Sequence, residues 1–272
     1  MADLDILVRR HDVSTAAQLL PALGYALRED QQEEKVREHF HRVYTSAEGV
    51  NLEIHWHIQL PAFPFQINVD ELWARADKAQ LLGIETQVLS PEDLLLHLCE
   101  HIASHHLLSF YGLRSLCDIV EIIRHYGERI DWEEIERRAA QWRIINSVFL
   151  TLYLAQKMLA AGVPESVLRR LQPDDFDPRL ADWAERRLLE HIGNEPEDPS
   201  LMSDGLGQIW ASRQWSVKLV TIWRTVFPRP PILAHMYGLT PHTKKVYLYY
   251  PVHIKNLLFR RARIIGLLLR HD

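Results

Sequence analysis

The chain has 272 residues, of which 47% are hydrophobic and 25% are charged, a composition typical of a globular protein with one or two domains. Its formal net charge of -5 excludes a global basic field that would draw it to nucleic acid. The sequence opens with aspartates rather than a basic and apolar leader, and no apolar run is long enough for a membrane span. Cys99 and Cys117 fall in apolar helical patterns, which predicts buried free thiols and a cytoplasmic protein.

The first predicted element is a strand over residues 2–8, where polar and apolar side chains alternate before an apolar end. Asp3 and Asp5 are two residues apart, so their side chains lie on the same face. Neighbouring carboxylates repel each other unless a cation lies between them, and magnesium prefers oxygen ligands. The pair therefore predicts a metal site, against the alternative that two aspartates near a chain end only keep the protein soluble.

The next elements, up to residue 89, predict a small α/β layer. They are a helix over 12–24, strands over 25–28, 39–46, 50–58 and 84–89, and a short helix from Asn68 or Asp70 to Trp73. The strands over 39–46 and 50–58 are close enough in sequence to form an antiparallel hairpin.

The strand over 50–58 carries a third carboxylate. Its apolar side chains take one face, while Glu53, His55 and His57 take the other. If this strand pairs beside the first one, Glu53 completes a three-carboxylate cluster with Asp3 and Asp5.

Several segments together resemble the nucleotidyltransferase superfamily, in particular a poorly characterised bacterial family within it. They are Asp-Leu-Asp-Ile-Leu-Val at the start, Leu-Gly-Tyr at 23–25, Leu-Glu-Ile-His-Trp at 52–56, the run over 89–101 and Leu-Cys-Asp-Ile at 116–119. The resemblance covers roughly residues 2–160. It implies transfer of a nucleoside monophosphate from a nucleoside triphosphate to a hydroxyl acceptor, a small molecule or a protein, with two magnesium or manganese ions.

The resemblance also implies roles for single residues. Asp3 and Asp5 would bridge the metal ions, and Glu53 would hold the ion beside the acceptor and help to deprotonate its hydroxyl group. His55, on the same strand face as Glu53, would orient Glu53 or the acceptor.

The superfamily carries a Gly-Ser or Gly-Gly turn before its first aspartate, which holds the nucleotide phosphates. Here only Met1 and Ala2 precede Asp3, so this α/β domain is expected to be incomplete at its start and to bind nucleoside triphosphate weakly. A non-catalytic protein of the same fold is therefore an alternative function.

After Ser90 the hydrophobic period changes from 2 to 3.6, which predicts an α+β domain over residues 1–89 and an all-helical domain over 90–272, with a cleft between them. Helices are expected over 90–106, 113–125, 131–142, 146–161, 180–192, 209–227 and 252–269, with a shorter one after Pro164. The last helix is basic and could lie on a membrane surface, but we expect its apolar stripe to pack on its own domain.

His97, His101 and His105 are four residues apart and form one stripe on the helix over 90–106. Such a stripe can chelate zinc, which makes a histidine-based metal-binding protein a second alternative, or it can contact neighbouring helices or line the cleft. We expect His101 and His105 to line the cleft on the acceptor side. Asp118, on the following helix, is expected to pair with one of them or to reach the substrate.

Overall fold

A computed structural model describes residues 3–28, 40–59, 67–105, 113–174, 176–190 and 244–256, with isolated positions between 223 and 237. Contacts within the chain define two compact units, Met1–Glu197 and Asp198–Asp272. The first unit contains both the sheet and helices α3 to α8, so the domain boundary at residue 90 stays a prediction.

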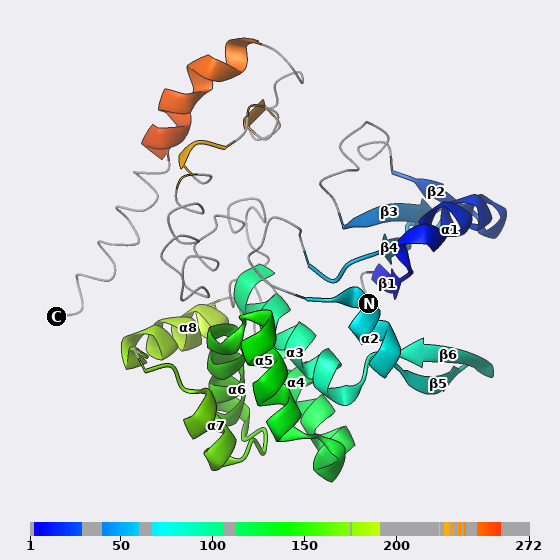
Figure 1. The fold of residues 1–272 in the computed structure, drawn as a ribbon. Helices are drawn as coiled ribbons and strands as arrows, with labels where there is room; N and C mark the ends of the chain where they lie inside the picture. The colour runs from blue at the N-terminus through cyan, green and yellow to red at the C-terminus, as the bar shows by residue number, and fades with distance from the viewer. Residues whose placement is uncertain are drawn as a thin grey trace. The chain divides into compact units, whose positions relative to one another are not determined.

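A mixed four-stranded sheet, in the order β1-β4-β3-β2, begins the first unit. Strand β1 is parallel to β4, whereas β4, β3 and β2 are antiparallel neighbours (Figure 1). The strands are β1 (Asp3–Leu7), β2 (Tyr25–Leu27), β3 (His41–Ser46) and β4 (Asn51–His55). The predicted hairpin is β3–β4, and the predicted α+β class with a small mixed sheet before the helices is confirmed.

One face of this sheet packs against a helical segment made of η1 (Arg10–Asp12), α1 (Val13–Leu19) and η2 (Leu20–Leu23). The core between them contains Leu20, Tyr44, Leu52 and Ile54. Because side chains alternate along a strand, the neighbours of Leu52 and Ile54 on β4 lie on the opposite face. The segment ends at Gly24, whose φ of 82° is readily accessible only to glycine.

A short helix and a second sheet connect the four-stranded sheet to the helices. Helix α2 (Val69–Arg75) begins at Asn68, whose side chain accepts a hydrogen bond from the Asp70 backbone. Strands β5 (Asp77–Leu81) and β6 (Ile84–Val88) form an antiparallel hairpin, of which only β6 was predicted.

The helices of the first unit pack around α6, which is buried along most of its length (Figure 1). They are α3 (Pro91–Glu100), α4 (Leu113–Tyr126), α5 (Trp132–Trp142), α6 (Ile145–Leu159), α7 (Glu165–Leu171) and α8 (Pro178–Glu190), with a 3-10 turn η6 (Gly127–Arg129) after α4. The predicted helix over 90–106 has α-helical geometry only in its first part, because residues His101–His105 form a π-helical turn, η5.

A buried carboxylate connects three of the helices. Asp93 on α3 is fully buried and accepts hydrogen bonds from Arg138 on α5 at 2.8 Å and from Arg75 on α2 at 3.0 Å. Removing one member of such a network would leave a buried charge without its partner, which is strongly destabilising. The network therefore holds α2 against the helices.

The two cysteines differ in exposure. Cys99 is fully buried, and burial raises the pKa of its thiol far above the usual value. Cys117 is exposed, so the prediction of a buried thiol there is wrong. The buried stripe of α4 consists of Leu116, Ile119, Val120 and Ile123, and Cys117 lies beside that stripe rather than on it.

In the second unit, Leu233, Ala234 and Val246 form a small core, with Tyr237, Tyr249 and Tyr250 packed against it. Val246 belongs to a 3-10 helix, η8 (Lys244–Leu248), and residues 249–256 continue as an α-helix. Most of the helices predicted over 209–227 and 252–269 lies outside the described residues. None of the helices in the described part of the chain has the length and apolar character that a membrane span requires.

Candidate active site

The parallel pairing of β1 with β4 places Asp5 directly opposite Glu53. Both residues therefore lie on the face of the sheet that α1 does not cover. The predicted pairing of these two strands is confirmed. Asp3 is opposite Asn51 in the same register, but its side chain lies outside the described part of the structure.

His55 joins the two carboxylates. Its Nε2 atom lies 2.9 Å from Asp5 Oδ1 and 3.2 Å from Glu53 Oε2. The imidazole is only 15% exposed, whereas the Asp5 side chain is 64% exposed, so the cluster is open to solvent on the β1 side.

His41 on β3 is a further member of the cluster. Its Nε2 atom lies 3.6 Å from Glu53 Oε2, and its ring stacks on the ring of His55 with 4.9 Å between centroids. Sequence analysis did not single out His41. The signal was nevertheless present, because the antiparallel register that follows from the turn at 47–49 places His41 opposite His55.

The charges in this cluster depend on one another. Burial opposes the protonated form of His55, but its hydrogen bonds to Asp5 and Glu53 and their negative charges outweigh burial and raise the pKa of His55 to about 9. The hydrogen bond from His55, together with nearby imidazole charge that includes His97, lowers the pKa of Asp5. In neutral solution the cluster thus contains an imidazolium between two carboxylates.

The donor atoms fit a divalent cation. One ligand atom from each of His41, Glu53 and His55 lies within 4.8 Å of the others, close enough to share one ion once the His55 ring releases its proton to become a ligand. The carboxylates of Asp5 and Glu53 converge on the same ring nitrogen, and carboxylate oxygens are ligands that magnesium and manganese accept.

The predicted histidine stripe is only partly within reach of this cluster. The electrostatic influence of His97 on Asp5 places it near the carboxylates, and its ring is 5.6 Å from that of His101. The side chain of His105 lies outside the described residues, so its predicted role stays a prediction. Asp118 is exposed on α4, and its predicted pairing with His101 or His105, or its contact with a substrate, stays a prediction.

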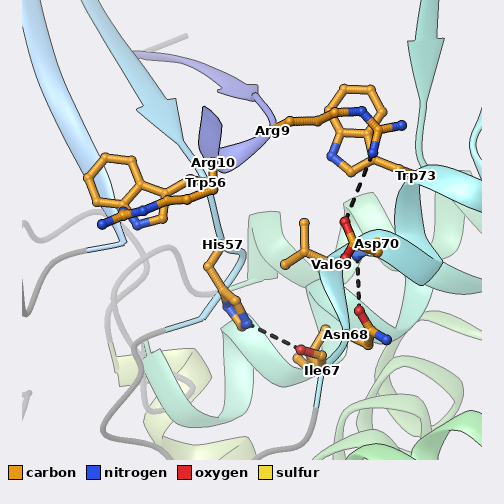
Figure 2. A pocket seen from close by; sticks show the side chains of 9 residues that line it. All are labelled: Arg9, Arg10, Trp56, His57, Ile67, Asn68, Val69, Asp70 and Trp73. Atoms are coloured by element: carbon orange, nitrogen blue, oxygen red, sulfur yellow. Dashed lines mark hydrogen bonds and ion pairs between the residues drawn. The ribbon is translucent and has the colours of Figure 1, made fainter. Parts of the chain in front are cut away.

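A pocket opens where the chain leaves β1 and β4 (Figure 2). Two arginines, two tryptophans and the start of α2 contribute to its walls. His57, which was predicted to share a face with Glu53, lines this pocket, and its Nε2 atom lies 3.2 Å from the carbonyl of Ile67. The sequence signal for the pocket was the basic pair Arg9-Arg10 directly after the first strand, which was not considered.

Residues 1–160 match the model of a protein family described as an uncharacterised nucleotidyltransferase. The chain belongs to this family. The match includes β1 and β4 with the carboxylate cluster, the pocket residues and helices α1 to α6. No curated protein and no solved structure matches the chain. The suspected nucleotidyltransferase resemblance is confirmed, and the roles of the individual site residues stay predictions.

Proposed function

We propose that the chain transfers a nucleoside monophosphate from a nucleoside triphosphate to a hydroxyl group of a small molecule or a protein. The observation that carries this proposal is the convergence of Asp5 and Glu53 on His55, at 2.9 and 3.2 Å, from neighbouring parallel strands. Membership of a nucleotidyltransferase family supports a nucleoside triphosphate as the donor. The acceptor oxygen would bond to the α-phosphorus while the bond to the pyrophosphate oxygen breaks and pyrophosphate leaves.

Glu53 is the residue best placed to accept the proton of the attacking hydroxyl group. Its side chain is 22% exposed, so a substrate can reach it, and the nitrogen atoms of His55 and His41 lie 3.2 and 3.6 Å from its Oε2 atom. These contacts hold the carboxylate in one orientation, which is a requirement for efficient proton transfer. His55 is therefore a positioning residue in this proposal.

Asp5 and Glu53, together with Asp3, would hold the divalent metal ions, with magnesium or manganese as the expected cofactor. When bound, two such ions supply positive charge to both the attacking and the leaving oxygen atoms. The hydrogen bond that His55 donates holds the Asp5 carboxylate ionised, as a metal ligand must be.

Two alternative functions are less well supported. Among the described residues, the cluster that could hold a metal ion contains His41, Glu53 and His55, which favours a metal site on the sheet. A non-catalytic protein of the same fold is less well supported because the Asp5 carboxylate of the cluster is 64% exposed and accessible to a substrate.

The test uses the full chain, a nucleoside triphosphate labelled at the α-phosphate, and manganese or magnesium. Transfer of label to small molecules or proteins of a cell extract identifies the acceptor class. Asp5→Asn and Glu53→Gln should each reduce label transfer on the order of 100-fold, because each removes a negative charge from the metal-binding cluster. Both variants should keep the melting temperature of the unchanged chain within a few degrees.

Asp182→Asn is a matched control, because Asp182 is an exposed aspartate on α8, paired with Lys157 outside the cluster. It should transfer label at the unchanged rate. Metal-dependent transfer that survives in both Asp5→Asn and Glu53→Gln would contradict the assignment of the site. Absence of transfer with every nucleotide, in spite of metal binding that depends on Asp5, would favour the non-catalytic alternative.

A further inference from the structure

The pocket where the chain leaves β1 and β4, which we call the arginine pocket, has a volume of about 630 Å³. Its lining consists of Arg9, Arg10, Trp56, His57, Ile67, Asn68, Val69, Asp70 and Trp73. The volume is within the range of about 300–1,000 Å³ that is usual for small-molecule sites. Because it lies beyond the carboxyl ends of the two parallel strands β1 and β4, it occupies the position where open α/β sheets bind ligands.

Each arginine in this pocket lies over a tryptophan ring. The guanidinium carbon of Arg9 is 4.8 Å from the ring centroid of Trp73, and that of Arg10 is 4.6 Å from the centroid of Trp56. Figure 2 shows the two pairs on opposite sides of the pocket, with His57 and Val69 between them. Stacking fixes the plane of a guanidinium group but leaves the N–H groups at its edge available for hydrogen bonds.

The pocket has an excess of positive charge. Asp70 is the acidic residue of the lining, and its contact with Arg9 is long, at 3.9 Å, between side chains that are 90% and 45% exposed. Such an exposed ion pair contributes little stability, so an anionic ligand can replace it. Arg10 has no carboxylate partner among the described residues.

His57 fixes the wall of the pocket without adding charge. Its Nδ1 atom accepts a hydrogen bond from the Gln59 backbone at 3.0 Å, so its Nε2 atom donates to the carbonyl of Ile67 at 3.2 Å. Burial lowers the pKa of His57, which favours the neutral ring. The imidazole therefore holds Ile67 against the end of β4 and leaves the two arginines as the cationic groups of the lining.

We propose that the arginine pocket binds a small molecule through its phosphate group. A phosphate presents oxygen atoms in several directions, so it can accept hydrogen bonds from the free edge of a stacked guanidinium group and from a second donor at once, whereas a carboxylate presents two oxygen atoms in one plane. Ile67 and Val69 provide apolar surface for the carbon part of the same molecule. A nucleic acid polymer is a poorer fit, because the site is a concave pocket on a chain of net charge -5.

The phosphate could belong to the nucleoside triphosphate donor or to a phosphorylated acceptor. Phosphate binding itself does not depend on the transfer reaction, and only this assignment rests on the proposed function. The two sources can be separated by binding measurements, because one of them competes with a nucleotide and the other binds together with it.

The experiment is a calorimetric titration of the full chain with inorganic pyrophosphate, in the presence of a chelator that removes metal ions. Arg10→Gln should weaken binding about tenfold or more, since it removes one charge-assisted donor group. Arg10→Lys should retain part of the affinity, because it keeps the charge and loses the planar fork. Asp70→Asn should strengthen binding, since it removes the carboxylate that competes with the ligand for Arg9.

Arg124→Gln is the matched control, because Arg124 is an exposed arginine on α4 that forms an ion pair with Glu121. It should leave pyrophosphate affinity unchanged. If Arg10→Gln binds pyrophosphate as tightly as the unchanged chain, or if Asp70→Asn has no effect on affinity, the phosphate assignment is overturned. A melting curve of each variant shows whether an affinity loss comes from unfolding, and the opposite sign expected for Asp70→Asn cannot result from a destabilised fold.

A second titration distinguishes the sources of the phosphate. Ribose 5-phosphate and, separately, a non-hydrolysable nucleoside triphosphate with magnesium are added to the chain. If the pocket is an acceptor site, it binds ribose 5-phosphate even when the nucleotide is already bound. If it is a donor site, the added nucleotide competes with pyrophosphate and displaces it. If Arg10→Gln loses pyrophosphate binding but retains label transfer, the pocket binds a phosphate that the transfer does not need, and the proposed function stands.

Discussion

At the scale of single residues, His55 is the connection that makes a cluster out of two separate carboxylates. Asp5 and Glu53 are opposite each other on neighbouring strands, and without a cation between them their charges would repel. The imidazole hydrogen-bonds to both, at 2.9 and 3.2 Å, and thereby holds them at a fixed separation. The protonated imidazole thus takes the place of a cation between the two carboxylates and offsets their repulsion.

Glu134 on α5 shows how a carboxylate outside the site stabilises the fold. Its side chain accepts hydrogen bonds from Arg137 at 2.6 Å and from the buried Arg138 at 2.8 Å. These hydrogen bonds and the two positive charges lower the pKa of Glu134 from 4.5 to about 2. Because the pKa is depressed in the folded state, the contribution to the free energy of unfolding is present above pH 4.5 and is lost as the pH falls toward 2.

Glu134→Gln should therefore lower the free energy of unfolding at neutral pH and make its decline between about pH 4.5 and pH 2 less steep. Urea unfolding at a series of pH values measures both effects. Glu121→Gln, a change to an exposed carboxylate on α4, serves as the control and should leave the pH dependence as it is. If the free energy of unfolding falls equally steeply with decreasing pH in Glu134→Gln and in the unchanged chain, other carboxylates dominate acid unfolding.

At the scale of secondary-structure elements, the π-helical turn η5 follows a hydrogen bond between two helices. The hydroxyl group of Thr151 on α6 donates to the carbonyl of Cys99 at 3.1 Å, and both residues are fully buried. Cys99 lies two residues before the π-helical turn begins at His101. The hydroxyl group supplies a donor to a main-chain carbonyl where regular α-helical geometry ends.

Replacement of Thr151 by Val removes this donor and keeps the branched shape of the side chain. The free energy of unfolding should fall by about 1–3 kcal/mol, because a buried hydrogen bond is lost. Thr151→Ser keeps the hydroxyl group but loses a methyl group. Comparison of the two variants therefore distinguishes the contribution of the hydrogen bond from that of packing. If Thr151→Ser is the less stable of the two in urea unfolding, packing rather than the hydrogen bond is the main contribution of Thr151.

Periodicity predicted strands with a buried face and also the exposed strand β6, whose apolar and polar side chains alternate. Strand β4 is an example with a buried face, since its buried Leu52 and Ile54 alternate with half-buried Glu53 and His55. Strand β5 (Asp77–Leu81) was missed because only Ala79 and Leu81 of its residues are apolar, an alternation too short to indicate a strand. The histidine stripe relied on a constant helical period, and the π-helical turn from His101 onward changes that period.

The candidate site was predictable only in part. The two adjacent strands and the carboxylates of Asp5 and Glu53 followed from alternation and from the family resemblance. His41 and the arginine pocket did not, because they depend on strand register and on where the chain returns after residue 59. The turn at 47–49 and the Arg9-Arg10 pair are local signals, but they show which residues meet only when the register and the path of the chain are known.

At the scale of the whole molecule, the family match and the first compact unit end at different points. The match ends at residue 160, directly after α6, whereas the unit continues to Glu197 and includes α7 and α8. Both of these helices pack on α6, whose buried side chains include Leu150, Leu152 and Leu154. The helices beyond the match thus cover apolar surface that belongs to the family domain.

The position of β1 also has a consequence for self-association. It is one of the two edge strands of its sheet in the described structure, and its Leu4 and Ile6 side chains are 38% and 45% exposed. Such an edge is a template for pairing with strands of other molecules, which charged side chains on the same strand oppose. The acidity that a transfer reaction would require is therefore also a protection against aggregation.

Asp5→Asn should scatter more light than the unchanged chain as the protein concentration rises, whereas Asp182→Asn should not. Equal scattering of all three proteins would mean that the charge of Asp5 has no such protective effect. If Asp5→Asn does scatter more light, the carboxylate can be lost in evolution only when another feature prevents the edge strand from pairing with other molecules.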